Sequence, residues 1–287
     1  MNSKGVTVAG LIDDATARIA AALGLQRRDA RLDARVLAAH VLGVDAAWLI
    51  AHDTDLLSAQ QTDAYQTLLA RRLNGSPIAY LIGSREFFGR PFRVSPDVLI
   101  PRPDTERLIE LALAQIPPAQ AVDVLDLGTG SGCIAITLAR ERPLARVTAV
   151  DRSPAALAIA QRNAELLGAC VEFLASDWFS ALAGRRFDLV VSNPPYIAAA
   201  DPHLAQGDVR FEPLSALAAG PDGLDDLRHL IAAACAHLQP GGTLLLEHGH
   251  DQAKAVRTLL QQSCIPFPQS WNDLSGIPRV SGGKLSE

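Results

Sequence analysis

The apolar residues in the first part of the chain recur at the spacing of amphipathic helices. Leucine, isoleucine and alanine return every three to four positions across residues 8–23 and again across residues 29–42. Two shorter stretches, 46–50 and 58–73, show the same spacing. Because an α-helix has about 3.6 residues per turn, each stretch acquires one apolar face. The pattern predicts a small helical bundle that ends at the turn-forming sequence Asn74-Gly75-Ser76-Pro77.

The pattern then changes to short alternation. Residues 86–99 alternate around Gly89-Arg90, which predicts a β-hairpin. A helix is expected over residues 107–116, with Asp104 or Thr105 as its cap. These changes divide the chain into a helical domain at residues 1–76, a linker with a hairpin at 77–104, and a larger domain at 105–287.

In the larger domain, strand-like runs alternate with helical stretches. The runs are rich in valine and leucine and occupy residues 122–127, 146–150, 171–174, 189–191 and 243–246. Strands that alternate with helices are typical of a parallel sheet covered by helices. The predicted fold class is therefore α/β, with a Rossmann-like sheet joined through the hairpin to the helical bundle.

A glycine-rich turn joins the first of these runs to a helical stretch from Cys133 to Arg140. The turn is Gly128-Thr129-Gly130-Ser131-Gly132. Glycine allows the backbone to approach a ligand closely. A dinucleotide fingerprint needs its third glycine at position 133, where this chain has cysteine. The spacing instead resembles the first motif of S-adenosylmethionine-dependent methyltransferases, and the alternative is a tight turn that binds nothing.

Acidic residues follow the next two runs. Asp151 lies about twenty residues after the glycine turn, where a carboxylate can bind ribose hydroxyls. The alternative is that it helps to cap the helix that Ser153 and Pro154 begin. Asp177 and Trp178 follow the third run. They are predicted to hold an adenine, although Trp178 is equally suited to be a core aromatic residue.

The most informative motif is Asn193-Pro194-Pro195-Tyr196, which directly follows an apolar run and Ser192. Two prolines stiffen the turn and remove backbone donors. The Asn193 side chain adds an amide oxygen that accepts hydrogen bonds, and Tyr196 adds an aromatic face. These groups suit an NH2 attached to a planar system, such as an amide or the amine of a nucleic-acid base. Asn-Pro and Pro-Pro also occur in ordinary loops.

Composition argues against several classes of protein. The net charge is −5, whereas nucleic-acid binding favours a basic surface. No apolar run is long enough to cross a bilayer and no signal segment is seen, so we expect a cytoplasmic protein outside the membrane. Nothing in the sequence demands more than a monomer. The histidines show no ligand spacing, and no metal is expected. The widely spaced cysteines are predicted to be small buried residues without disulfides: Cys133, Cys170, Cys235 and Cys264.

Taken together, these motifs closely resemble the HemK family of peptide chain release factor glutamine methyltransferases. The resemblance spans nearly the whole chain and is most specific where the helical part joins Pro101-Arg102-Pro103-Asp104-Thr105-Glu106. Further matching segments are Arg71 to Tyr80, Arg85-Glu86-Phe87, Val98-Leu99-Ile100, the glycine turn, Asp177-Trp178, the Asn-Pro-Pro-Tyr motif, Phe211-Glu212-Pro213 and Asp222-Gly223-Leu224.

The resemblance implies an activity and a partner. Residues 128–132 are expected to bind the methionine part of S-adenosylmethionine, with Asp151 at its ribose and Trp178 near its adenine. Residues 193–196 are expected to receive the glutamine of a Gly-Gly-Gln loop on class 1 release factors, docked with help from the helical domain.

In that hypothesis, the Asn193 side-chain oxygen and the Pro194 carbonyl accept the two amide hydrogens of the glutamine, and Tyr196 packs against the amide plane. Two alternatives remain. One is a DNA methyltransferase acting on the amino group of adenine or cytosine. The other is a binding module that keeps the fold without transferring methyl groups.

Overall fold

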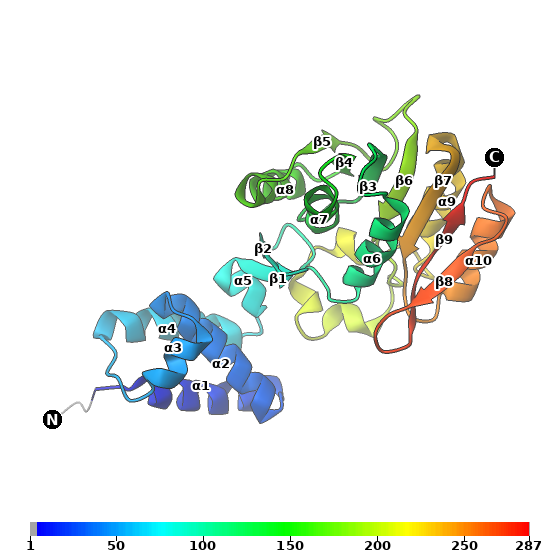
Figure 1. Ribbon diagram of the computed structural model, residues 1–287. Coiled ribbons are helices and arrows are strands. Elements are labelled where there is room, and N and C mark those ends of the chain that lie inside the picture. Colours follow the sequence, from blue (N-terminus) through cyan, green and yellow to red (C-terminus); the bar gives the residue numbers. More distant parts are fainter. Residues whose placement is uncertain (1–4, 287) are drawn as a thin grey trace. The chain divides into compact units, whose positions relative to one another are not determined.

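The computed structural model describes residues 5–286 and contains two compact units, Met1–Gly83 and Ser84–Glu287 (Figure 1). Residues 1–4 and 287, at the ends of the predicted domains, lie outside the described part. The first unit includes a short helix, α5 (Ile78–Ile82), in the region that we assigned to the linker. The linker's hairpin, β1 (Ser84–Phe87) with β2 (Arg90–Arg93), belongs to the second unit.

The first unit is a bundle of helices that closely follows the apolar periodicity. Its other helices are α1 (Val8–Leu23), α2 (Arg27–Leu42), α3 (Ala46–Ala51) and α4 (Ala59–Leu73). Thr7 caps α1 and Ser58 caps α4, and glycines in the left-handed region end α1 and α2. The Tyr65 hydroxyl, fully buried in the bundle, donates to the Ala34 carbonyl at 3.1 Å. The buried apolar faces of these helices form the core that stabilises this unit.

The second unit is built on a seven-stranded sheet with the order β5-β4-β3-β6-β7-β9-β8. Its strands are β3 (Asp123–Leu127), β4 (Arg146–Asp151), β5 (Val171–Ala175), β6 (Phe187–Ser192), β7 (Leu238–Glu247), β8 (Gln269–Asn272) and β9 (Pro278–Lys284). The first five in this order are parallel, as predicted, whereas β9 runs antiparallel to both β7 and β8. The α/β fold class and the mostly parallel sheet are confirmed, and the sequence did not indicate the antiparallel strand β9 at this edge.

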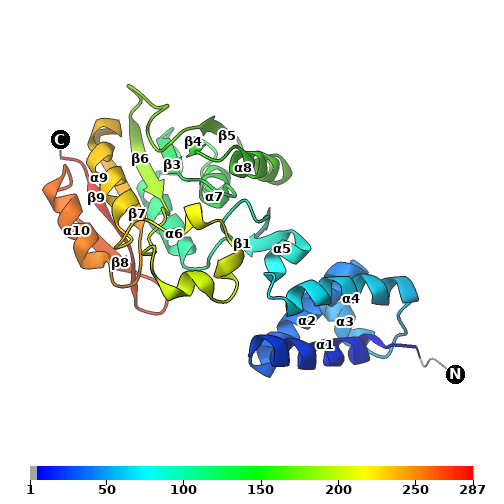
Figure 2. The ribbon, with the colours of Figure 1, turned by 180° about the vertical axis from the view of Figure 1, so that it is seen from behind.

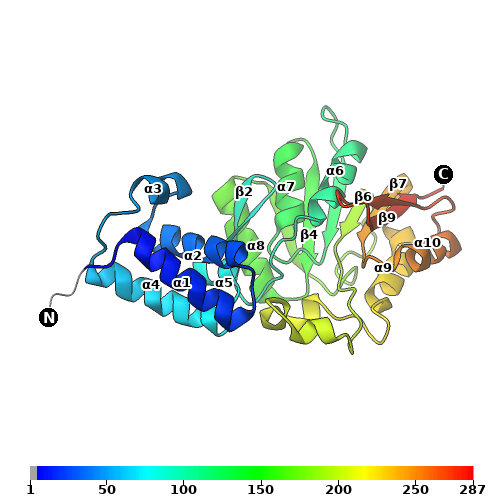
Figure 3. The same ribbon diagram turned by 90° about the horizontal axis from the view of Figure 1, so that it is seen from below.

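Helices cover both faces of this sheet (Figure 3). Side chains alternate along the strands, so Val124 joins the core under α6, α7 and α8, whereas Leu125 joins the core under α9 and α10. The helices are α6 (Thr105–Gln115), α7 (Cys133–Glu141), α8 (Pro154–Leu167), α9 (Asp225–His237) and α10 (Ala253–Gln262). None of the helices in the described range is long and apolar enough to span a membrane.

The direction in which successive strands are added to the sheet reverses between β3 and β6. This junction is the expected position of a ligand site. Leu127 pairs with Ser192 across this parallel junction. The glycine turn and the Asn-Pro-Pro-Tyr motif therefore begin side by side at the carboxyl ends of neighbouring strands. In open α/β sheets, ligands bind at such switch points. Figure 2 shows the yellow-green segment that follows β6 at the same end of the sheet; it holds three short 3-10 helices, η1 (Pro202–Ala205), η2 (Val209–Phe211) and η3 (Leu214–Ala216).

The predicted caps of two helices have different outcomes. Ser153 caps α8, with Pro154 in its first turn, as predicted. Asp104 and Thr105 do not cap α6: Asp104 has helical backbone angles and its side chain makes no cap hydrogen bond. Thr105 is the first helical residue, and its hydroxyl accepts a hydrogen bond from Asn193. The Thr105 hydroxyl, which the sequence predicted as a cap of α6, therefore binds the distant residue Asn193 instead.

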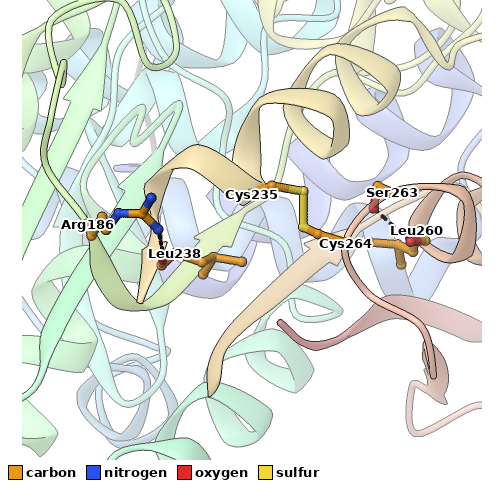
Figure 4. Close-up of a disulfide and its surroundings, with 6 residues drawn as sticks. All are labelled: Arg186, Cys235, Leu238, Leu260, Ser263 and Cys264. Carbon is orange, nitrogen blue, oxygen red and sulfur yellow. Dashed lines mark hydrogen bonds between the residues drawn. A yellow bond between two sulfur atoms is a disulfide. The ribbon is translucent and has the colours of Figure 1, made fainter. Parts of the chain in front are cut away.

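The prediction for the cysteines is wrong for three of the four. Cys133 is buried, as expected, whereas Cys170 is exposed. Cys235 on α9 and Cys264 after α10 form a disulfide, with their Cα atoms 5.8 Å apart (Figure 4). They are 29 residues apart in sequence. Because α9 and α10 pack on one face of the sheet, their folding creates a proximity that spacing does not reveal.

This bond gives a prediction for stability. A disulfide that closes a loop of this length limits the entropy of the unfolded chain, so Cys235→Ser should lower the free energy of unfolding by about 2–4 kcal/mol. Urea unfolding without reductant measures the difference. With reductant, the wild type and the variant should have nearly equal midpoints; equal midpoints without reductant would show that the bond does not form.

Candidate active site

A cavity of about 270 Å³ lies at the switch point. It contains most of the residues that the sequence nominated for the cofactor or the substrate: Gly128, Thr129, Gly130, Ser131, Asp151, Asp177, Trp178, Asn193 and Pro195. Gly132 supports the turn but does not line this cavity, and Pro194 is buried behind the surface. Tyr196 lines a second cavity of about 190 Å³, which shares Leu99, Arg102, Asn193 and Ala216 with the first. Asn193 therefore lies where the two cavities meet.

The glycine turn has the shape that a close ligand requires. Gly128, Gly130 and Gly132 all have positive φ, which favours glycine. A Cβ on Gly132 would lie 2.7 Å from the Ile136 side chain and 3.1 Å from Ala160, because the turn is packed directly on α7 and α8. A Cβ on Gly128 would meet the Trp178 ring at 3.1 Å. At Gly128 and Gly130, which line the cavity, the absence of a side chain leaves the backbone exposed to it.

Asp151 is placed between the turn and the following helix. Its carboxylate accepts hydrogen bonds from the backbone N–H of Gly130 at 2.9 Å and of Ser153 at 2.8 Å. The side-chain cap of α8 is Ser153, which accepts from Ala156. Each carboxylate oxygen has further lone pairs, and Asp151 lines the cavity, so it is oriented to accept from hydroxyls there.

The Trp178 ring lies between the apolar core and the cavity. Its ring packs against the apolar core of the second unit and also lines the cavity. Its backbone has φ +49, an uncommon value for a bulky residue, and the Ser176 hydroxyl donates to its carbonyl at 2.7 Å. The indole is therefore fixed at the edge of the cavity. Asp226, a further acid that the sequence did not nominate, lines the same cavity.

Asp126 is a functional candidate that the sequence analysis missed. It is fully buried on β3, where it accepts from the Thr129 hydroxyl at 2.6 Å and from the Ala135 N–H at 3.3 Å. It thereby ties the glycine turn to the first turn of α7. Burial raises the pKa of its carboxyl from 3.8 to about 7, against the lowering effect of these two hydrogen bonds. The sequence did contain a sign of this role, because Asp126 is a charged residue within the apolar run Val124-Leu125-Asp126-Leu127.

The raised pKa of Asp126 predicts how stability depends on pH. The folded state holds a proton that the unfolded state loses above pH 3.8, so the free energy of unfolding should fall as pH rises from about 4 to about 7. The full shift is worth on the order of 4 kcal/mol. In Asp126→Asn, which cannot ionise, much of this fall should disappear. Urea unfolding at several pH values checks the slope, and an unchanged slope in the variant would contradict the assignment.

The Asn-Pro-Pro-Tyr corner is held from several sides. The Asn193 side-chain NH2 donates to the Thr105 hydroxyl at 3.0 Å. The Tyr196 hydroxyl lies 3.5 Å from Glu247 Oε1, at the end of β7. Gln252 donates to the Tyr196 carbonyl at 2.9 Å. No residue in the described range donates to the Pro194 carbonyl. The corner therefore has fixed side chains and retains acceptors.

Glu247, the last residue of β7, is buried beside this corner. It is 1% exposed, and its Oε2 has no partner of ordinary hydrogen-bond geometry among the residues described. Burial raises its pKa to about 7. Burial, followed by the Glu247 charge, also raises the pKa of Tyr196, which therefore stays neutral.

A buried ion pair joins the cavity wall to the segment after β6. Arg102 lines both cavities and donates to Glu212 at 2.6 Å, and the Glu212 side chain is fully buried. These residues are 110 positions apart, in the Pro-Arg-Pro and Phe-Glu-Pro segments. The pair holds the segment that contains Pro213, Ser215 and Ala216 against the cavity.

The chain is similar to known methyltransferases in sequence and fold. Residues 107–208 match a model described as the methyltransferase small domain, and residues 11–83 match one described as the PrmC N-terminal domain. A solved methyltransferase from Pyrococcus furiosus superimposes with a TM-score of 0.54 at 17% identity, covering 77% of this chain and 100% of that one. A 16S rRNA methyltransferase from T. Thermophilus, in complex with AdoMet and guanosine, gives 0.53 at 24% identity, covering 70% and 49%.

The fold and the site define an S-adenosylmethionine-dependent methyltransferase. Two curated relatives are release factor glutamine methyltransferases. The one from Bordetella pertussis is 55% identical, covering 89% of this chain and 95% of the relative, and the one from Escherichia coli is 52% identical, covering 88% and 92%. The chain belongs to the release factor glutamine methyltransferase family, which confirms the resemblance inferred from its motifs.

Proposed function

We propose that the chain methylates the side-chain amide nitrogen of the glutamine in the Gly-Gly-Gln motif of class 1 peptide chain release factors. The observation that carries this is the position of Asn193. Its NH2 is bound to Thr105, so its amide oxygen is the end available where the two cavities meet. An oxygen acceptor is what a primary amide NH2 requires.

The cofactor cavity supplies a fitting set of groups. Gly128 and Gly130 expose backbone to the methionine part in a turn that Gly132 supports, Asp151 offers acceptors to the ribose, and Trp178 with Asp177 borders the adenine. When bound, S-adenosylmethionine supplies an electrophilic methyl group on a sulfonium.

The task left to the protein is to orient the glutamine amide nitrogen, which is a weak nucleophile. An amide nitrogen has its lone pair delocalised into the carbonyl, so placement decides its reactivity. Asn193 Oδ1 and the Pro194 carbonyl accept the two amide hydrogens and aim the nitrogen at the first cavity. As that nitrogen gains positive charge, the two carbonyl dipoles already point towards it and stabilise it. Tyr196 lines the second cavity and packs against the amide plane.

The helical unit is assigned to docking of the release factor. Residues 1–76 hold no cluster of catalytic groups in their sequence, and most of them fall within the match to the N-terminal domain model. We assign residues 77–104 to a linker and residues 105–287 to methyl transfer. We propose that the enzyme acts as a cytoplasmic monomer without direct nucleic-acid binding.

A transfer assay with labelled S-adenosylmethionine tests the proposal. Three acceptors are compared: a class 1 release factor, the same factor with the glutamine of its Gly-Gly-Gln motif replaced by alanine, and double-stranded DNA. Label should enter the intact factor only. Label on DNA would support the nucleic-acid alternative, and equal label on both release factors would place the acceptor elsewhere.

A further inference from the structure

The second cavity is mainly apolar, and it contains one charged side chain. Its aliphatic lining comes from Leu99, Ile197, Val209, Ala216 and Leu217. Arg102 is the one charged residue among the described residues that line it, and Arg102 also lines the first cavity. Pro101 and Pro103 restrict the backbone on both sides of Arg102, because a proline ring fixes φ. Arg102 is therefore held at the junction of the two cavities, where Asn193 also lies.

Arg102 keeps hydrogen-bonding capacity after its ion pair. A guanidinium has five N–H donors and no acceptor. Within residues 5–286, the one hydrogen bond of the Arg102 side chain runs from Nη2 to Glu212 Oε1 at 2.6 Å, and this side chain is 33% exposed. The Asn193 NH2 is already bound to Thr105, and the Tyr196 hydroxyl lies 3.5 Å from Glu247. Arg102 is therefore the side chain that can donate to a substrate oxygen at the junction.

The chemistry of the proposed substrate indicates which oxygen Arg102 binds. Two glycines precede the acceptor glutamine, and glycine has no side chain, so a site recognises them through their backbone groups and through close approach. The glutamine amide oxygen is a poor partner, because a cation there would draw the nitrogen lone pair further into the carbonyl and slow its attack. A main-chain carbonyl of the loop has no such disadvantage, and when buried it needs a donor.

We propose that Arg102 is a substrate-binding residue that donates hydrogen bonds to main-chain carbonyl groups of the Gly-Gly segment, and that Glu212 positions its guanidinium. This inference rests on the proposed function and adds how the acceptor loop is recognised. The Glu212 side chain is fully buried and lines neither cavity, so it holds the guanidinium from outside the space that a substrate enters. Charge-assisted hydrogen bonds of this kind are short and strong.

Glu212 also neutralises the charge of Arg102. The sulfonium of S-adenosylmethionine is positive, and an unpaired guanidinium lining the same cavity would repel it. The Glu212 carboxylate, 2.6 Å from Arg102 Nη2, offsets this repulsion. Arg102 can then offer its donors to the substrate without its charge opposing the cofactor.

A double substitution removes the donors without leaving a buried charge unpaired. Arg102→Met combined with Glu212→Gln retains long side chains at both positions and no ion. With a release factor as acceptor, we expect the KM for the factor to rise about tenfold, the loss expected for a hydrogen bond to a charged donor. The kcat and the dissociation constant for S-adenosylmethionine should change by less than about threefold, because the Ile197 N–H to Leu217 carbonyl bond at 2.9 Å also holds the segment after β6.

The matched control is Arg90→Met combined with Glu141→Gln. This second ion pair has the same 2.6 Å separation, and neither residue lines a cavity. The control should keep the wild-type KM for the release factor within about twofold. A tenfold rise in the control as well would show that loss of any ion pair is enough, and the role of Arg102 would be overturned.

Glu212→Gln alone tests neutralisation by a binding measurement. It leaves Arg102 charged, so the dissociation constant for S-adenosylmethionine should rise about fivefold relative to that for S-adenosylhomocysteine, whose thioether is neutral. In the double variant the ratio of the two constants should return to the wild-type value. A mere loss of packing would weaken both ligands equally and leave the ratio unchanged, and that result would overturn the role of Glu212.

Two further outcomes separate this inference from the proposed function. A wild-type KM for the release factor in the double variant would overturn substrate binding by Arg102 while leaving the proposed function intact. If the wild type transfers no methyl to the factor, the proposed function itself fails, and with it this inference. Melting temperatures confirm that each variant is folded.

Discussion

Asn193→Ala is expected to lower kcat for methyl transfer by about 100- to 1,000-fold, the loss seen when one preorganised dipole is removed from a polar active site. The dissociation constant for S-adenosylmethionine should change by less than about fivefold, since the glycine turn and Asp151 lie on neighbouring elements. Single-turnover transfer to a release factor and calorimetric titration of the cofactor measure the two quantities.

The control for this experiment is Asn272→Ala. Asn272 is exposed on edge strand β8 and lines neither cavity. It should therefore retain wild-type turnover within about twofold. If Asn193→Ala also retained wild-type turnover, the amide oxygen would have no part in the reaction.

Gly223→Ala is expected to displace the Asn-Pro-Pro-Tyr corner through its contact with the Tyr196 backbone. Gly223 has φ +74, and a Cβ there would lie 2.3 Å from the Tyr196 carbonyl oxygen, a backbone atom that moves only if the corner moves. We expect a loss of about 3 kcal/mol in the free energy of unfolding, from left-handed strain together with the clash. Turnover should fall at least tenfold, because a displacement of this size misplaces the substrate amide.

Gly168→Ala separates strain from clash. Gly168 also has positive φ, but its added Cβ would meet only the end of the Arg140 side chain, at 3.6 Å. This control should lose about 1 kcal/mol of stability and no activity. Equal losses in both variants would show that the contact with Tyr196 is unimportant.

Local patterns in the sequence predicted much of the fold and part of the site. Periodicity located the helices of the bundle, and the run before Gly128 located β3 and its glycine turn. The Asn-Pro-Pro-Tyr motif could be recognised because the properties that matter are local ones: proline stiffens its own backbone, and asparagine carries its own hydrogen-bonding amide. Such features depend on neighbours within a few residues, which a single sequence displays.

Contacts between distant segments were beyond single-sequence reasoning. The Thr105–Asn193 hydrogen bond and the Arg102–Glu212 ion pair join segments 88 and 110 residues apart. Burial of Glu247 depends on β9 pairing with β7 in antiparallel fashion, which no local pattern indicated. The Cys235–Cys264 disulfide depends in the same way on two helices that meet on one face. These features appear only when the register of the sheet is known.

The paired oxygens of a rigid corner beside the cofactor cavity are the centre of this account, and locating the transferred methyl tests them most directly. A release factor treated with the enzyme and isotopically labelled S-adenosylmethionine would be digested and fragmented by tandem mass spectrometry. The account predicts the label on the side-chain nitrogen of the Gly-Gly-Gln glutamine in wild-type samples, and almost none with Asn193→Ala. A label on a carboxylate, a lysine or any other residue would contradict it.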